Sequence, residues 1–197
     1  MGRPSRYTAA DLVRAVQELA TQQSPAEVTI SAVSRAAGAP VGSIYHRFPS
    51  QAALLGAAWL DALEAFQAGF IPALEDPGEP GLAACTHTLR FSRAEPARAR
   101  VLVLHRARDF GSQEWPPEDR ERSRRLATEL DAALGAFASR HLGAPGGEAW
   151  RRATFAVLDV PYAAVHRYLA VGVEPPPQID AYLTAALPVI LAARRPG

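Results

Sequence analysis

Apolar residues recur along most of this chain at intervals of three and four, which is the spacing of one face of an α-helix. In the first such run, Leu12, Ala15, Val16 and Leu19 fall on one side. No stretch alternates between apolar and polar positions as a half-buried strand does. The pattern therefore predicts an all-α protein with about nine helices in total. We expect these helices over residues 9–23, 30–37, 41–47, 51–70, 82–92, 96–109, 120–141, 148–171 and 178–194.

Hydroxyl side chains stand at the expected starts of several helices, where they fit as N-caps. Thr8 precedes the first helix and has Asp11 three residues later, which is the spacing of a capping box. Thr29 and Ser50 stand in the same way before the second and fourth helices. These residues fix the expected starts of the helices from local chemistry alone.

Residues 29–48 combine two short helices with a tight turn between them. Gly38 suits the left-handed backbone that ends a helix, and Pro40 discourages its continuation. In the second short helix, Ile44 and Phe48 are expected to face inward. Two helices joined in this way form a helix-turn-helix, which places its second helix in the major groove of DNA.

Composition narrows the class of protein. Hydrophobic residues make up 48% of the chain, which is enough for a packed core. We find no uninterrupted apolar run of the roughly 18 residues that a membrane-spanning helix needs, and no secretory signal at the N-terminus. Cys85 is the single cysteine, so the chain has no internal disulfide. We expect a cytoplasmic protein without a membrane partner.

The charge pattern limits how DNA could be bound. The net charge is +1, and every one of the 21 basic residues is arginine. Residues 1–60 carry five arginines and three acids, a balance of only +2. Binding by bulk charge is therefore disfavoured, and affinity for DNA must come from the placement of individual side chains.

Residues 8–55 resemble the N-terminal DNA-binding domain of the TetR family of transcriptional regulators. The resemblance rests on Thr29, on Ala36-Ala37-Gly38, on the segment Gly42-Ser43-Ile44-Tyr45-His46-Arg47-Phe48, on Ser50 and on Leu54-Leu55. It implies a DNA-binding domain over residues 1–50 and a ligand-binding and dimerisation domain over residues 51–197. Beyond residue 60 only the helical layout resembles the family.

The resemblance also implies roles for single residues. Base-facing positions are Ser31, Val41, Gly42 and Tyr45. Phosphate-facing positions are Thr29, Ser43, His46, Arg47, Gln51, Arg3 and Arg6, the last two in an N-terminal arm. Gln51 stands where the family usually has lysine, so it releases no counterion and the salt dependence should be weaker. Taken singly, Tyr45 could be half core with only its hydroxyl at the surface, and Arg47 could be an ordinary solvated charge.

The C-terminal helices carry weaker signals. As candidate lining of an effector pocket we select aromatic and polar positions expected to face inward: Trp59, Phe66, Phe91, His105, Phe155, Asp159, Tyr162 and His166. For any one of them, a plain core residue is the favoured alternative. Pro161 and Pro188 lie within expected helices, where each removes one backbone hydrogen bond and either frees a carbonyl for a ligand or only bends the helix.

The last two expected helices, about 148–171 and 178–194, are apolar on more than one side. A helix that is apolar all round must be buried all round. Packing one side into the core and the other against a second subunit achieves this, so we expect a homodimer through these helices. A central helix inside a single subunit is the alternative.

Together these features predict a one-component transcriptional regulator, with a repressor favoured, which binds a near-palindromic double-stranded operator and is released by a small-molecule effector. The helix that begins after Ser50 would link the two halves. No catalytic motif is present, so we expect no enzyme and no cofactor. We also weighed a DNA-binding or architectural protein without a ligand, a small helical enzyme, a metal held by His105, Asp159 and His166, and a redox role for Cys85, and favour none of them.

Overall fold

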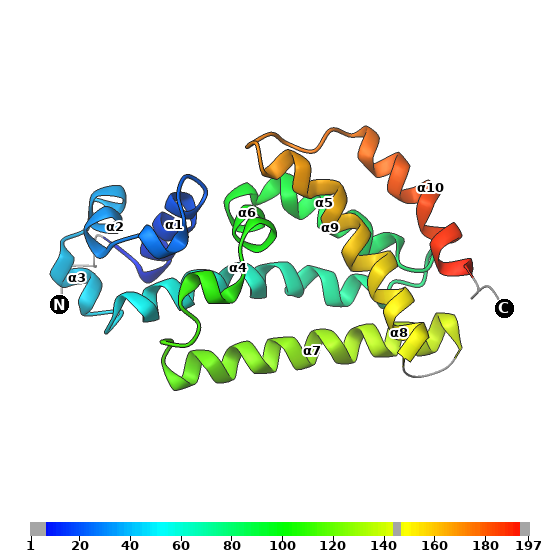
Figure 1. Ribbon diagram of the computed structural model, residues 1–197, viewed down its shortest axis with the longest axis horizontal. Helices are drawn as coiled ribbons and strands as arrows, with labels where there is room; N and C mark the ends of the chain where they lie inside the picture. The colour runs from blue at the N-terminus through cyan, green and yellow to red at the C-terminus, as the bar shows by residue number, and fades with distance from the viewer. Residues whose placement is uncertain (1–6, 144–146, 194–197) are drawn as a thin grey trace, which may run out of the picture.

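The computed structural model describes residues 7–143 and 147–193, and every regular element within these ranges is helical (Figure 1). The helices are α1 (Ala9–Ala20), α2 (Ile30–Ala37), α3 (Val41–Tyr45), α4 (Gln51–Ala73), α5 (Leu82–Ala94), α6 (Pro96–Leu104), α7 (Pro117–Leu142), α8 (Gly147–Thr154), α9 (Val160–Leu169) and α10 (Gln178–Ala192). A π-helical turn, Phe155–Asp159, joins α8 and α9 into one continuous rod. The predicted all-α class is confirmed.

Local side-chain chemistry starts and ends the N-terminal helices as the sequence indicates. Thr8 Oγ1 accepts the backbone N–H of Asp11 at 3.1 Å, and the Asp11 carboxylate accepts the backbone N–H of Thr8 at 2.9 Å. Thr29 caps α2 and Ser50 caps α4 through the same kind of bond. Gly38 ends α2 with a φ of 64°, a conformation that glycine adopts without steric cost.

Helix α4 organises the molecule. The small helices α1, α2 and α3 lie together at one end, α4 runs from them through the centre, and α7 lies beside α4 (Figure 1). Near its start, Leu54, Leu55 and Ala58 of α4 are buried in one core with residues of α1, α2 and α3. Near its end, Phe70 is buried in a second core with residues of α5, α7 and α10. One continuous helix therefore belongs to both ends of the protein.

By length and mean hydropathy, α4 could cross a membrane, although its apolar residues do not form an uninterrupted run. Asp61 and Glu64 are the charged residues among its 23 residues, so its mean hydropathy is high. Half of its most apolar stretch is buried inside the fold. The apolar side chains that give α4 its high mean hydropathy also pack into the two cores.

Several helix boundaries differ from the predicted ones by two to five residues, and two of these differences have a clear physical cause. The helix expected over 96–109 ends at Leu104, because His105 has extended backbone and a new 3-10 turn, Ala107–Phe110, follows it. The Asp109 carboxylate caps that turn by accepting the backbone N–H of Arg106 at 2.7 Å. Helix α7 begins at Pro117, three residues before the predicted start, since proline is well suited to the first position of a helix.

Pro161 has a visible effect on the backbone. In the preceding turn the N–H of Val160 donates to the carbonyl of Phe155, five residues back. Because Pro161 has no N–H, the usual bond to the carbonyl of Val157 cannot form, and the widened turn absorbs the mismatch. Pro188 lies inside α10 without interrupting it.

Candidate DNA-binding surface and effector cavity

The outer side of α3 carries the predicted base-facing residues. Tyr45 is 52% exposed and Val41 is 40% exposed, although both are large and apolar or aromatic. Gly42 lies between them, and a Cβ added there would meet no atom within 4 Å. On the opposite side Ile44 is fully buried in the core. Helix α3 therefore has one side anchored in the core and one side open for contact. Ser31 of α2, the remaining residue predicted to face a base, is also exposed.

Arg47 and Ser43, both predicted to face phosphate, are bound to each other inside the protein. One guanidinium nitrogen of Arg47 donates to the carbonyl and to the hydroxyl of Ser43, each at 2.8 Å. The other donates to the carbonyl of Tyr7 at 2.8 Å. Arg47 thus fastens the end of α3 to the segment before α1, a positioning role that the sequence pattern does not indicate.

The remaining predicted phosphate contacts are mixed in character. Thr29 and His46 are exposed, while Gln51 is half-buried at the start of α4. The hydroxyl of Thr29 is already engaged as the cap of α2. Arg3 and Arg6 lie outside the described residues. Two further exposed arginines, Arg14 and Arg35, lie on α1 and α2, and no motif in the sequence singles them out.

A cavity of about 390 Å³ lies between α4, α5, α6, α7 and the α8–α9 rod. Six of the eight predicted pocket residues line it: Trp59, Phe66, Phe91, His105, Asp159 and Tyr162. Phe155 and His166 do not. Phe155 is 51% exposed, because the widened turn at Phe155–Asp159 shifts it away from the side on which Asp159 and Tyr162 lie. His166 is exposed on α9, one turn beyond Tyr162.

Most polar groups of the cavity are already bonded within the protein. The hydroxyl of Thr88 donates to the carbonyl of Ala84, and that of Ser92 donates to the carbonyl of Leu89. The hydroxyl of Tyr162 donates to the carbonyl of Val103 at 2.5 Å. The walls therefore behave as an apolar surface toward anything inside.

Arg106 also lines the cavity, although no sequence pattern points to it. Its guanidinium donates to the hydroxyl of Tyr162 at 3.2 Å and to the carbonyl of His105 at 3.1 Å. The bond to Tyr162 raises the pKa of Arg106, so this side chain is always charged. The helix predicted over residues 96–109 includes Arg106, so the helical pattern does not place this residue at a cavity.

Residues beside the cavity contact the DNA-binding end directly. His105 shares a hydrogen bond of 3.0 Å between its Nε2 and the carbonyl of Ala20, at the end of α1. Arg100, further back on α6, donates to the carbonyl of Thr21 at 2.7 Å. The end of α6 is therefore bonded to the end of α1 at two points.

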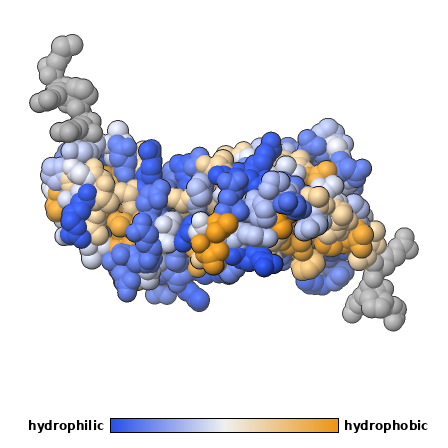
Figure 2. Space-filling view, turned by 90° about the horizontal axis from the view of Figure 1, so that it is seen from above, coloured by the Kyte–Doolittle hydropathy of each residue, from blue (hydrophilic) through white to orange (hydrophobic). Residues whose placement is uncertain are grey.

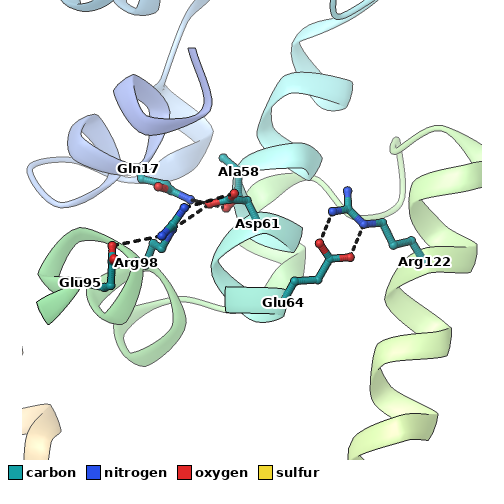
Figure 3. Close-up of polar contacts among 7 residues, drawn as sticks. All are labelled: Gln17, Ala58, Asp61, Glu64, Glu95, Arg98 and Arg122. Atoms are coloured by element: carbon teal, nitrogen blue, oxygen red, sulfur yellow. Dashed lines mark hydrogen bonds and ion pairs between the residues drawn. The ribbon is translucent and has the colours of Figure 1, made fainter. Parts of the chain in front are cut away.

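A second polar contact joins α1, α4 and α6, and Figure 3 shows it. The amide of Gln17, which is almost fully buried, donates to the carbonyl of Ala58 at 3.0 Å and to the carboxylate of Asp61 at 2.8 Å. The same carboxylate accepts a bond of 2.9 Å from Arg98 of α6. Further along α4, Glu64 pairs with Arg122 of α7 (Figure 3). None of these partners is local in sequence, so no short motif indicates them.

The C-terminal helices leave apolar side chains in solvent. In the space-filling view, hydrophobic surface gathers toward the end of the molecule that carries the C-terminus (Figure 2). Tyr182 and Val189 of α10 are 66% and 71% exposed, and Phe155 is half-exposed. These residues fall within the two ranges predicted for the subunit interface. Residue 194, the end of the second range, lies outside the described residues.

Two of the weaker interpretations can be compared with the structure. Cys85 is buried, and burial raises the pKa of its thiol to about 12, so the reactive thiolate that a redox switch needs is suppressed. His105 and Asp159 both line the cavity, but His166 does not. Within residues 7–143 and 147–193, no three side chains of His, Cys, Asp or Glu are grouped so that they could hold a metal ion.

Comparison with known proteins supports the resemblance at two levels. Residues 12–58 match the family model for bacterial regulatory proteins of the tetR family. No curated protein matches the sequence. A TetR family regulator, PfmR, from Thermus thermophilus superposes with a TM-score of 0.66 at 16% identity, over 94% of this chain and 99% of that one.

Two other solved structures agree to a similar degree. A TetR family regulator from Marinobacter aquaeolei has a TM-score of 0.66 at 14% identity, over 91% of this chain and 93% of that one. FadR from Bacillus subtilis, solved in complex with stearoyl-CoA, has a TM-score of 0.66 at 10% identity, over 95% of this chain and the full length of that one. At such low identity these similarities establish the fold.

The helix-turn-helix and the all-α fold behind it are those of the DNA-binding regulators to which this chain is similar. Residues 12–58 thus carry the DNA-binding domain of bacterial regulatory proteins of the tetR family, and the chain has the fold of solved TetR family regulators.

Proposed function

We propose that this protein is a dimeric repressor that binds a near-palindromic operator and is released by a small molecule in the cavity. Residues 1–50 contact DNA, and residues 51–197 bind the effector and the second subunit. As a DNA-binding regulator it acts in the cytoplasm. The observation that carries the proposal is the open side of α3, where Tyr45 and Val41 are exposed on a helix whose other side is locked into the core.

The geometry of α3 supports contact with base edges. Residue 42 is a glycine, and the space beside its Cα is empty, so the backbone of α3 can approach the groove closely. Tyr45 presents both a ring and a hydroxyl from the same side. His46 is exposed next to Tyr45, and Thr29 and Ser31 are exposed at the start of α2. All three are proposed to contact the operator with Tyr45.

Dimerisation is supported by the exposed apolar residues of α10 and the α8–α9 rod. Packing against a second copy of the chain would remove the apolar surface of Tyr182, Val189 and Phe155 from water. A two-fold dimer supplies two recognition helices, and these match two half-sites about 34–36 Å apart or a multiple of that distance.

Release by an effector is supported by the bonds between α6 and α1. His105 faces the cavity and at the same time holds the carbonyl of Ala20, so a ligand that moves His105 acts directly on the DNA-binding end. Helix α4 gives a second route, since Asp61 binds Gln17 of α1 and Arg98 of α6. A ligand shifts DNA affinity only if it binds the two arrangements with different affinity.

The DNA-binding proposal is tested by selecting bound fragments from genomic DNA with the purified full chain. We expect a near-palindromic site that binds two chains. Tyr45→Ala should weaken binding to that site by about 1–3 kcal/mol if Tyr45 reads a base. Tyr45→Phe is the matched control, because it removes the hydroxyl and keeps the ring.

Three results would contradict the proposal. They are failure to enrich any fragment at moderate salt, a lone subunit in solution by analytical ultracentrifugation, and unchanged operator affinity for Tyr45→Ala. The first two would overturn the dimeric repressor, and the third would remove Tyr45 from the base contacts.

A further inference from the structure

We infer that the effector is an apolar monocarboxylate whose carboxylate is bound by Arg106 at the edge of the cavity. This inference rests on the proposed effector function and adds the chemical class of the ligand. It follows from which polar groups of the cavity are already satisfied and which are not.

The body of the cavity offers a ligand almost nothing to hydrogen-bond. Trp59, Phe66 and Phe91 supply aromatic walls, and Leu63, Leu102, Val103, Leu130, Leu158 and Val165 supply aliphatic ones. The hydroxyls of Thr88 and Ser92 donate to carbonyls of their own helix. A polar ligand would lose its bonds to water without replacement, so the part of the ligand inside this cavity must be apolar.

Arg106 is the group that can receive a polar end. Two of its donor bonds, to the hydroxyl of Tyr162 and the carbonyl of His105, use a single nitrogen, Nη1. Among the described residues no carboxylate lies within 4.0 Å of this guanidinium, whereas several other arginines have such a partner. The guanidinium is thus held in place with its remaining donors available, and a planar fork of this kind fits a carboxylate.

Two acidic side chains also bear on this choice. Asp109 accepts the backbone N–H of Arg106 at 2.7 Å and lies 3.8 Å from Arg108, and its charge also raises the pKa of Arg106, so it is shared between the two arginines. Asp159 lines the cavity and is exposed, and among the described residues its carboxylate has no hydrogen bond or ion pair. It could attract an amine instead. Arg106 is favoured because Tyr162 and His105 orient it, whereas nothing orients Asp159.

The size of the cavity sets the size of the ligand. A volume of about 390 Å³ lies at the lower end of the range for small-molecule sites. A bicyclic aromatic acid fits such a space and matches the aromatic walls. Naphthylacetate is therefore a suitable probe, with its primary amide and the corresponding naphthylethylamine as probes of equal apolar body and different charge.

The test measures binding of the three probes to the full-length protein by titration calorimetry near neutral pH. We expect naphthylacetate to bind several-fold more tightly than the amide or the amine, since a charge-assisted pair with Arg106 is favourable but this side chain is exposed and solvent screens the pair. Arg106→Gln should remove that advantage and leave amide binding unchanged. Arg108→Gln is the matched control, since Arg108 is 81% exposed and does not line the cavity, and it should bind all three probes as the parent does.

Each alternative result overturns the inference. Equal binding of acid and amide, or an Arg106→Gln variant that keeps the preference for the acid, would remove Arg106 as the anchor. Tighter binding of the amine, lost in Asp159→Asn, would identify a cationic ligand. No binding of any probe would also overturn it. Thermal melting of each variant confirms folding, and binding of the selected operator is measured separately, so failure of the ligand class is distinguished from failure of the repressor proposal.

Discussion

At the scale of single residues, Arg47 shows how a side chain can be engaged before any partner arrives. Sequence resemblance points it toward phosphate, but the structure gives its guanidinium bonds to Ser43 and to the carbonyl of Tyr7. These bonds connect α3 with the segment before α1. The orientation of the recognition helix thus depends on an arginine whose donors are directed into the protein.

Replacing Arg47 should therefore lower stability. Arg47→Met keeps the aliphatic stem and removes the donors, and we expect the free energy of unfolding to fall by about 1–3 kcal/mol because backbone and hydroxyl acceptors lose their partner. Urea denaturation followed by circular dichroism measures the change. Arg35→Met, at an exposed position of α2, is the control and should change stability by less than about 0.5 kcal/mol. An Arg47→Met variant of unchanged stability but reduced affinity for the operator would assign the residue to phosphate contact instead.

At the scale of helices, the contact between α4 and α5 depends on a missing side chain. The ring of His87 on α5 lies over Gly69 of α4, where an added Cβ would come within 2.2 Å of it. His87 cannot easily retreat, because Phe66, Phe70 and Phe91 surround its ring and its Nε2 is 2.9 Å from the carbonyl of Phe66. Burial also lowers the pKa of His87, so the ring is neutral near neutral pH.

Two glycine-to-alanine substitutions should consequently have opposite effects. Gly69→Ala forces α4 and α5 apart, and we expect it to lower the free energy of unfolding by about 1–3 kcal/mol. Gly135→Ala in α7, where an added Cβ meets nothing within 4 Å, should raise it by about 0.5–1 kcal/mol because alanine favours the helix. Thermal and urea unfolding of the pair measure both changes, and a stabilised Gly69→Ala protein would contradict the close packing described.

At the scale of the whole molecule, one core crosses the boundary between the two proposed functional halves. Leu12, Val16 and Ile44 of the DNA-binding end are buried in the same cluster as Leu54 and Trp59 of α4 and as Phe110 and Trp115 beyond α6. Gln17 adds its buried bonds to α4. The proposed functional boundary at residue 50 therefore does not coincide with a boundary of the hydrophobic core.

A fragment of residues 1–50 should for this reason not fold alone. It lacks α4, and the apolar faces of α1, α2 and α3 would remain in water, leaving too little burial to offset the loss of chain entropy. Far-ultraviolet circular dichroism should show little helix and no cooperative melting, while the full chain melts cooperatively. Cooperative melting of the fragment would show that the N-terminal helices need no support from α4.

The sequence predicts the parts of this protein that local rules determine. Caps at Thr8, Thr29 and Ser50 and the left-handed Gly38 depend on neighbours within a few residues, and the helices they delimit follow. The break after Leu104 escapes prediction because the apolar spacing continues through it. Arg106 and Asp61 escape it because their partners lie far away in sequence, and no pattern within one helix records such contacts.

The widened turn at Phe155–Asp159 makes the register between α8 and α9 a matter of a single residue. Each residue advances an α-helix by about 100°. A turn of this kind holds one residue more than a regular turn, so deleting one residue here would return the rod to regular winding while α8 and α9 keep nearly the same sides toward the cavity and the solvent. Elsewhere in the rod, the same deletion would rotate one part against the other by that angle. At this point of the chain, a one-codon deletion should therefore disturb sensing and subunit pairing least.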